Sequence, residues 1–186
     1  MSLVLGYATP KNAIIMSDGR AGKNGSYSEY YDKTLKVNDN IILGFAGIME
    51  NIDMFLDCIM LNMGENRKYY LMDDFLEMVD FVMQDEETKN NLQSSFIIIG
   101  RDSKNNMIAS TVGHVTDYKI EKGIAYNPKF LSIGGTIEAK IINEIYINHI
   151  GEMNQSPSSA MQKMIKDVSK LDPAVNGNIF YSLISF

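Results

Sequence analysis

The first 47 residues contain four short, apolar runs of β-prone residues, arranged as two pairs. The runs are residues 3–8, 13–16, 34–37 and 41–45. Turn-forming residues separate the two runs of each pair, at positions 9–12 and 38–40. A long loop joins the pairs, and Asp18 closes the second expected strand while Lys33 opens the third. This arrangement predicts two antiparallel hairpins and limits the chain to folds that contain antiparallel sheet.

The rest of the chain alternates between helical and extended patterns. Apolar residues recur at helical spacing in residues 50–63, 73–84, 137–150 and 158–171, and Ser156-Pro157 supplies an N-cap and a first-turn proline for the last helix. Further strands are predicted at residues 95–100, 107–112, 115–120, 124–126, 130–133 and 178–186. The polar residues 86–93 are expected to be a link. The pattern predicts an α+β fold, and the length predicts one domain, residues 1–186.

Composition narrows the range of partners. A formal net charge of −6 and a pI of about 4.9 argue against a nucleic-acid partner, because phosphate binding needs clustered Lys and Arg. The single cysteine, Cys58, excludes an internal disulfide and fits a reducing, cytoplasmic compartment. No signal peptide or membrane span is expected, because residues 1–8 lack a basic start and no run approaches eighteen apolar residues. His114 and His149 are too isolated for a metal site, so neither metal nor cofactor is predicted.

Three segments of the N-terminal region resemble a known family. They are Asp18-Gly19-Arg20-Ala21, Lys33, and Gly44-Phe45-Ala46-Gly47. Proteasome β-type subunits and HslV-type peptidases carry an Asp-(Gly/Ser)-(Arg/Gln)-Ala step after the second strand, a lysine opening the third strand, and Gly-x-Ala-Gly after the fourth. Ser2 lies sixteen positions before Asp18, which is the family's spacing from nucleophile to Asp. The resemblance to these N-terminal-nucleophile hydrolases implies a four-layer αββα sandwich of two antiparallel sheets.

Later segments extend the resemblance over most of the chain. Residues 98–102 match the Gly-x-Asp that ends the family's fifth strand, and residues 132–135 resemble the glycine-rich start of its third helix. Residues 172–177 resemble an Asp-x-x-Ser-Gly-Gly segment. Asp172 is retained there, whereas Val175 stands where the family has a supporting serine.

The resemblance implies a role for each matched residue. Once Met1 is removed, the Ser2 hydroxyl would attack a peptide carbonyl, and its own α-amine, with a pKa of about 7.7–8.0, would take the proton. The Lys33 ammonium would favour the free amine and the alkoxide, and Asp18 would hold Lys33. The amide of Gly47 would stabilise the oxyanion. The resemblance also makes Asp172 a supporting catalytic residue and assigns substrate binding to Arg20, Ala21 and Phe45, with Phe45 lining the pocket for the residue before the cleaved bond.

Two other classes stay open. One is a catalytically inactive assembly or binding subunit of the same fold, in which Asp18 and Lys33 form a buried ion pair only. In support of that class, serine is common at any N-terminus, and Met-Ser-Leu can also be a cloning-derived start. The other is an amidase that acts on small substrates. The partners implied are a peptide or unfolded-protein substrate for an active enzyme, further copies of the chain in a homo-oligomer or closed ring, and an ATPase.

Overall fold

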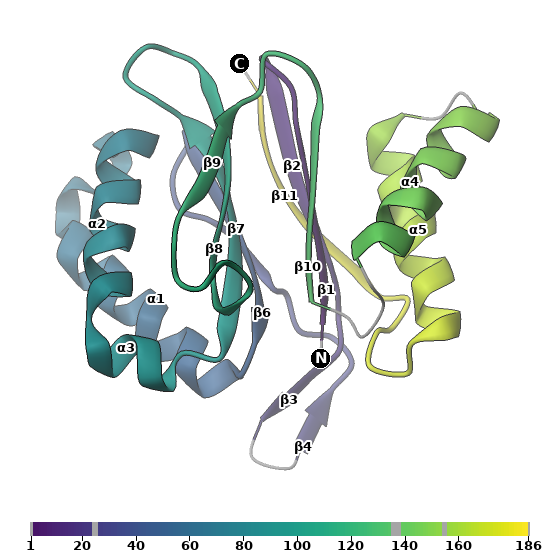
Figure 1. Ribbon diagram of the computed structural model, residues 1–186, viewed down its shortest axis with the longest axis horizontal. Coiled ribbons are helices and arrows are strands. Elements are labelled where there is room, and N and C mark those ends of the chain that lie inside the picture. Colours follow the sequence, from purple (N-terminus) through teal and green to yellow (C-terminus); the bar gives the residue numbers. More distant parts are fainter. Residues whose placement is uncertain (1, 24–25, 135–138, 154–155, 186) are drawn as a thin grey trace.

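Two antiparallel sheets stacked face to face form the centre of the molecule. The computed structural model describes residues 2–23, 26–134, 139–153 and 156–185. One sheet has the strand order β10-β1-β2-β11, and the other has the order β5-β6-β7-β8-β9. Helices α1–α3 cover the second sheet, and α4 and α5 cover the first (Figure 1). The predicted α+β class and the four-layer αββα arrangement are therefore confirmed.

The elements follow the chain in a simple order. The strands are β1 (Leu3–Ala8), β2 (Asn12–Asp18), β3 (Ala21–Lys23), β4 (Ser26–Ser28), β5 (Thr34–Lys36), β6 (Ile41–Gly47), β7 (Ser94–Arg101), β8 (Met107–Gly113), β9 (Glu121–Ile124), β10 (Lys129–Gly134) and β11 (Ile179–Ser185). The helices are α1 (Met49–Met63), α2 (Met72–Gln84), α3 (Glu86–Asn91), α4 (Ala139–Met153) and α5 (Pro157–Leu171), with 3₁₀ turns η1 (Gly64–Tyr69) and η2 (His114–Thr116).

The two predicted hairpins belong to different sheets. The β1–β2 hairpin lies at the centre of the first sheet, because β10 pairs with the free edge of β1 and β11 with the free edge of β2. The β5–β6 hairpin begins the second sheet and continues through β7. The end of β2 and the start of β5 thus meet between the sheets, at the point where Asp18 and Lys33 lie.

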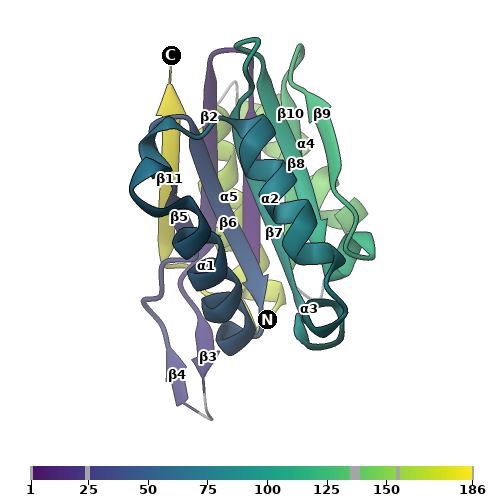
Figure 2. The same ribbon diagram turned by 90° about the vertical axis from the view of Figure 1, so that its left-hand side faces the viewer.

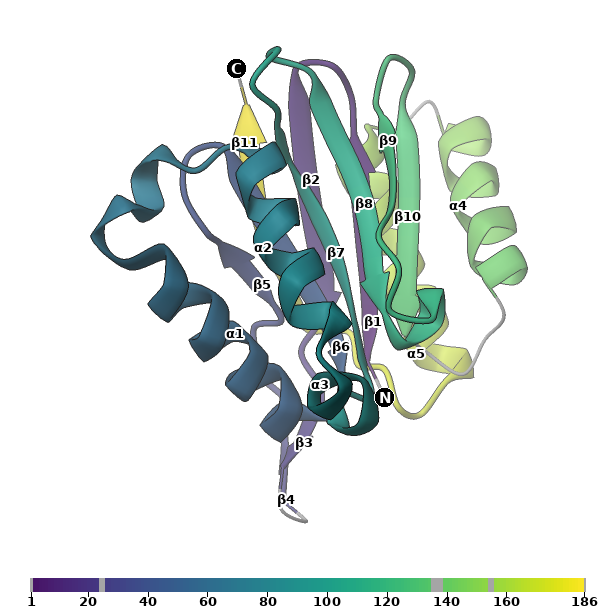
Figure 3. The ribbon, with the colours of Figure 1, turned by 60° about the vertical axis from the view of Figure 1, so that its left-hand side comes forward.

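Three apolar layers hold the sandwich together. The middle layer lies between the sheets and includes Val4, Ile15 and Ile97. An outer layer joins the second sheet to α1 and α2, whose packing is visible in Figures 2 and 3, and the opposite outer layer joins the first sheet to α4 and α5. Strand β7 contributes Phe96 to one layer and Ile97 to the next, because both of its faces are buried, as its continuous β-branched run predicts.

Three expectations from the sequence are wrong. Residues 86–91 are a helix and not a link, because the Asp85 carboxylate caps it by accepting from the Thr88 amide at 2.9 Å. Residues 115–120 form no strand, because η2 and left-handed backbone at Asp117 and Tyr118 turn the chain there. The next strand is β9, which spans Glu121–Ile124 in place of the strand predicted at residues 124–126. The long loop before Lys33 contains the β3–β4 hairpin. Residues 137–138 of the third predicted helix, and residue 186, lie outside the described residues.

Candidate active site

A buried ion pair between Lys33 and Asp18 lies at the end of the β1–β2 hairpin. The Lys33 Nζ donates to Asp18 Oδ1 at 2.6 Å, and both side chains have an exposed fraction of 0%. Strand β2 ends at Asp18, and Lys33 comes immediately before β5, where its carbonyl accepts from the Phe45 amide. The pairing of β5 with β6 therefore carries Lys33 to the end of β2.

The Asp18 carboxylate is fixed from four directions. Besides Lys33, its Oδ1 accepts from the Leu3 amide at 2.8 Å. Its Oδ2 accepts from the amides of Arg20 at 2.9 Å and Asn176 at 3.2 Å. A buried carboxylate without hydrogen-bond donors would be costly, and these amides supply the donors that Asp18 needs.

Competing influences set the charge of Lys33. Burial lowers the pKa of Lys33 from its usual value, and the positive charge of Arg20 lowers it further. The Asp18 carboxylate opposes both by attraction and by its hydrogen bond. Among the described residues, Asp18 is the hydrogen-bond partner of the Lys33 ammonium, which holds the positive charge at the end of β2.

Ser2 lies beside this pair. The amide of its neighbour Leu3 donates to Asp18, the residue Ser2 is 6% exposed, and its Oγ is 3.5 Å from the Arg20 carbonyl oxygen. A Cβ placed on Gly134 would collide with the Ser2 carbonyl and would lie 3.0 Å from the Cβ of Ala46. The ends of β2, β6 and β10 therefore converge around Ser2, next to the residue that precedes Gly47.

The Ser94 side chain, which the sequence analysis did not select, holds the backbone after β6. The Ile48 amide donates to Ser94 Oγ at 3.1 Å, and Ser94 Oγ in turn contacts the Ile48 carbonyl at 3.3 Å. Gly47 itself is exposed at the end of β6, opposite Ser94 in the register with β7. The strand pairing of Ser94 is the signal that would have identified it, and only the structure gives that pairing.

The loop between α5 and β11 closes the other side of the site. Asp172 is 1% exposed, and its Oδ1 accepts from the Ala174 amide at 2.8 Å. Asn176, which the sequence analysis did not select, contacts Asp18 through its amide and accepts from the Gly19 amide at 2.8 Å through its Oδ1. Val175 is buried against the first sheet and α5.

The three residues assigned to substrate binding have different surroundings. The Arg20 guanidinium binds Glu29, with Nε to Oε1 at 3.0 Å, and also donates to the Pro173 carbonyl. Ala21 is largely buried at the start of β3. Phe45 is 4% exposed and packs with Met49 in the layer beneath α1. Arg20 therefore lies at the site with its charge paired, whereas the Phe45 side chain fills the core.

Comparison with known proteins establishes the architecture. Models of known protein families give no match, and a comparison with curated protein sequences gives none. Among solved structures, the eukaryotic HslV from Trypanosoma brucei superposes with a TM-score of 0.71, covers 99% of each chain and is 12% identical. The chain has the fold of HslV. At this identity the HslV-like similarity concerns the fold, and the roles of the site residues rest on their own geometry.

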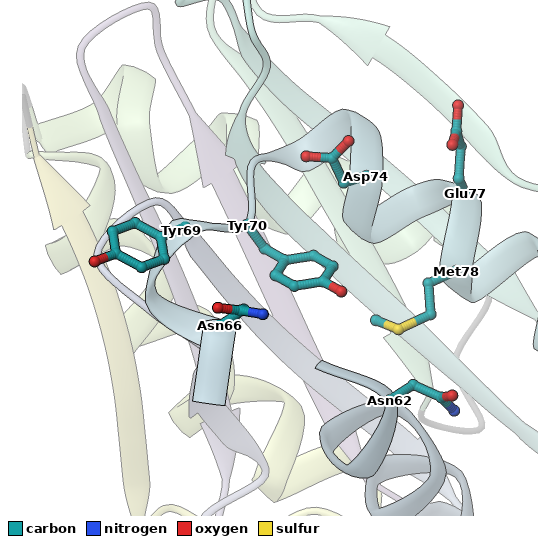
Figure 4. A pocket seen from close by; sticks show the side chains of 7 residues that line it. All are labelled: Asn62, Asn66, Tyr69, Tyr70, Asp74, Glu77 and Met78. Carbon is teal, nitrogen blue, oxygen red and sulfur yellow. The ribbon is translucent and has the colours of Figure 1, made fainter. Parts of the chain in front are cut away.

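A separate open pocket lies on the helical layer over the second sheet. It has a volume of about 650 Å³ and is lined by Asn62, Asn66, Tyr69, Tyr70, Asp74, Glu77 and Met78 (Figure 4). These residues come from α1, η1, α2 and the segment between them, and none belongs to the Ser2 site. Among the described residues, no group of three or more His, Cys, Asp or Glu is placed to hold a metal ion, and no helix has the length and apolar character needed to span a membrane.

Proposed function

We propose that this chain is an HslV-like N-terminal-nucleophile hydrolase that cleaves peptide amide bonds, with Ser2 as nucleophile once Met1 is removed. The observation that carries this proposal is the fully buried Lys33–Asp18 pair beside Ser2. An ammonium ion is costly to bury, and the carboxylate that binds it also accepts from the amide of Leu3, the residue after Ser2. That combination supplies a nucleophile, a base and a fixed positive charge at one point.

The proposed reaction begins with the free α-amine of Ser2. The amine takes the Ser2 hydroxyl proton, directly or through water, while Oγ attacks the substrate carbonyl carbon. The amide of Gly47 would donate to the oxyanion, and Lys33 would stabilise the developing negative charge. Collapse breaks the C–N bond, the leaving amine takes the proton, and water then hydrolyses the acyl ester on Ser2. While Met1 is present, the Ser2 nitrogen is an amide and cannot act as a base.

The decisive experiment compares Met1-retained and Met1-free protein on small fluorogenic peptides. Activity is expected only in the Met1-free form, and Ser2→Ala and Lys33→Ala should each remove it. General-base and electrostatic contributions are worth factors of about 10² to 10⁴ each, so even partial losses are measurable. Lys36→Ala is a matched control, because Lys36 forms an exposed pair with Asp39 away from the site. Equal activity in the two forms would rule out the mechanism.

An inactive assembly subunit of the same fold is the second candidate. Two observations favour it: the Val175 side chain is apolar and buried, and the Phe45 side chain occupies the core where a substrate pocket was expected. Absence of turnover from Met1-free protein that is correctly folded and assembled would support this candidate. Activity on small amides without activity on peptides would instead indicate an amidase.

The proposal extends to partners and location. We propose that copies of the chain assemble into a homo-oligomer, with a closed ring as one form, because closed symmetry satisfies every interface. For an active enzyme, the substrate would be a peptide or unfolded protein, and an ATPase would deliver it. The single cysteine fits a cytoplasmic location. Pull-down of a nucleotide-hydrolysing protein by the wild-type assembly would support the ATPase partner.

A further inference from the structure

Glu29 is not part of the buried Lys33–Asp18 pair, but it forms hydrogen bonds with two residues that bind Asp18. Its carboxylate accepts from Arg20 Nε at 3.0 Å and Arg20 Nη2 at 3.2 Å, and from Asn176 Nδ2 at 2.6 Å. Its carbonyl oxygen accepts from Asn176 Nδ2 at 2.9 Å and Asn178 Nδ2 at 2.8 Å. A residue that directly follows the β3–β4 hairpin is thus fixed to the loop between α5 and β11.

The same residues lead inward to Lys33. The backbone amides of Arg20 and Asn176 both donate to Asp18 Oδ2, and Asp18 Oδ1 binds the Lys33 ammonium. Asp18 from β2 is therefore the charged group in contact with Lys33, Arg20 after β2 also acts on its charge, and Glu29 after β4 is connected through Arg20 and Asn176. Asp172 lies in the loop that carries Asn176, and removal of Met1 would add the α-amine of Ser2. Arg20 is the cation among these side chains, and its charge acts against that of Lys33.

We propose that Glu29 is an electrostatic positioning residue of this site. Through its ion pair with Arg20, it limits the positive potential that the guanidinium imposes on the Lys33 ammonium. Asn176 holds Glu29 in place and at the same time binds Asp18. Hydrogen bonds from Asn176 and Arg20 also lower the pKa of Glu29, so the carboxylate stays charged wherever the site works. The consequence for turnover rests on the proposed function, but the effect on Lys33 does not.

The proposal predicts opposite changes for the two members of the pair. Glu29→Gln keeps the shape but removes the negative charge, so the guanidinium is no longer neutralised and the pKa of Lys33 should fall. Arg20→Gln removes the opposing cation, so the pKa of Lys33 should rise. The double variant should return it close to the wild-type value. Lys33 pKa changes of opposite sign in the two single variants, with little net change in the double variant, would result from charge and not from a general loosening of the site.

The test is an NMR titration of the Lys33 side-chain nitrogen in the full-length, Met1-retained protein, which requires no activity. Asp39→Asn is the matched control, because Asp39 pairs with an exposed lysine and should leave Lys33 unchanged. An unchanged Lys33 titration in folded Glu29→Gln, or a fall in Arg20→Gln, would overturn the proposal. Glu29→Gln is the decisive variant, because a loosened site would expose Lys33 and raise its pKa, opposite to the predicted fall. If Glu29→Gln does not fold, Arg20→Gln is compared with Arg20→Lys, which keeps the positive charge: a rise in Arg20→Gln alone supports the proposal, and equal rises in both variants overturn it.

The catalytic arm uses Met1-free protein. Glu29→Gln should lower kcat/KM by about 1.5- to 5-fold at neutral pH, the size usual for a partly exposed ion pair, and move the alkaline limb of the pH profile to lower pH. Shifts in the Lys33 titration without turnover in any variant would support this inference and contradict the proposed function. Turnover without a shift in the Lys33 titration would support the proposed function and overturn this inference.

Discussion

At the scale of single residues, the site combines a buried charge pair with a close backbone contact. Lys33 and Asp18 are hidden from solvent and bound to one another, and Ser2 is enclosed against Gly134. Buried pairs of this kind add little net stability compared with apolar residues, but losing one partner leaves an uncompensated charge. Because the pair adds little net stability, its role depends on its position beside Ser2.

Asp18→Asn is expected to destabilise the protein by about 3–5 kcal/mol, because it leaves the Lys33 ammonium buried without a counter-charge. Urea unfolding monitored by circular dichroism measures the change. The control is Asp39→Asn, which breaks the exposed Lys36–Asp39 pair and should cost less than about 1 kcal/mol. Similar losses in the two variants would show that the Asp18–Lys33 pair is effectively solvated.

Gly134→Ala is expected to displace Ser2. Gly134 has φ +81°, and an added Cβ would collide with the Ser2 carbonyl. Gly64→Ala is the matched control, because Gly64 also has a positive φ, of +54°, but no atom lies within 4 Å of an added Cβ. Backbone strain alone costs about 1–3 kcal/mol in either variant. Only Gly134→Ala should also change the Lys33 side-chain NMR signal, and an identical signal would contradict the close contact.

At the scale of elements, α4 and α5 are joined by polar contacts as well as by their apolar layer. His149 Nε2 on α4 lies 2.9 Å from Asp167 Oδ2 on α5, and Lys170 Nζ donates to Asp167 Oδ1 at 2.7 Å. The hydrogen bond from Lys170 is the largest cause that lowers the pKa of Asp167, and His149 lowers it further; partial burial acts in the opposite direction. Asp167 thus connects the two helices that cover the first sheet.

Asp167→Asn should lower the stability at pH 7 by at most about 0.5–1 kcal/mol, because the carboxylate is 38% exposed and solvent screens it. A carboxyl whose pKa is lowered by folding stabilises the native state above its unfolded pKa, and that stabilisation disappears as the pH falls through the lowered value. The difference between wild type and variant should therefore shrink as the pH is lowered from 7 towards 2. Chemical denaturation at the two pH values measures it; a difference that persists at pH 2 would mean that packing, not charge, is responsible.

At the scale of the whole molecule, the layers follow from the apolar patterns, whereas the polar contacts that fix the site do not. Strand β7 was predictable from its continuous apolar run, and helices α1, α2 and α5 were predictable from apolar residues that repeat at helical spacing. Helix α3 was missed because its six residues carry no apolar face and depend on the Asp85 cap. Asp18 and Lys33 were recognisable from their family spacing. Glu29 and Asn176 were not, since 147 positions separate them in the chain.

Apolar side chains exposed on both helical layers predict association. Leu61 on α1 and Phe81 on α2 are each 81% exposed, and Ile147 on α4 is 65% exposed. Single exposed apolar residues are ordinary, but their presence on opposite faces is what an assembly with two contact surfaces requires. Multi-angle light scattering at high micromolar concentration should give a mass that is a multiple of 20.9 kDa. A mass equal to one chain would contradict this prediction.

The strand order β10-β1-β2-β11 has a consequence for how the protein is made. The first hairpin leaves the ribosome early, but its two edges are covered only by β10 and β11, which are encoded much later. At a synthesis rate of about 5–20 residues per second, roughly 8–32 s pass between the synthesis of the end of β2 and that of its partner β11. During that time a nascent apolar hairpin exposes unpaired backbone on both sides, a form prone to pairing with neighbouring chains. Chaperones that bind the chain during synthesis and shield short apolar segments should therefore raise the yield of native protein more than those that act after release.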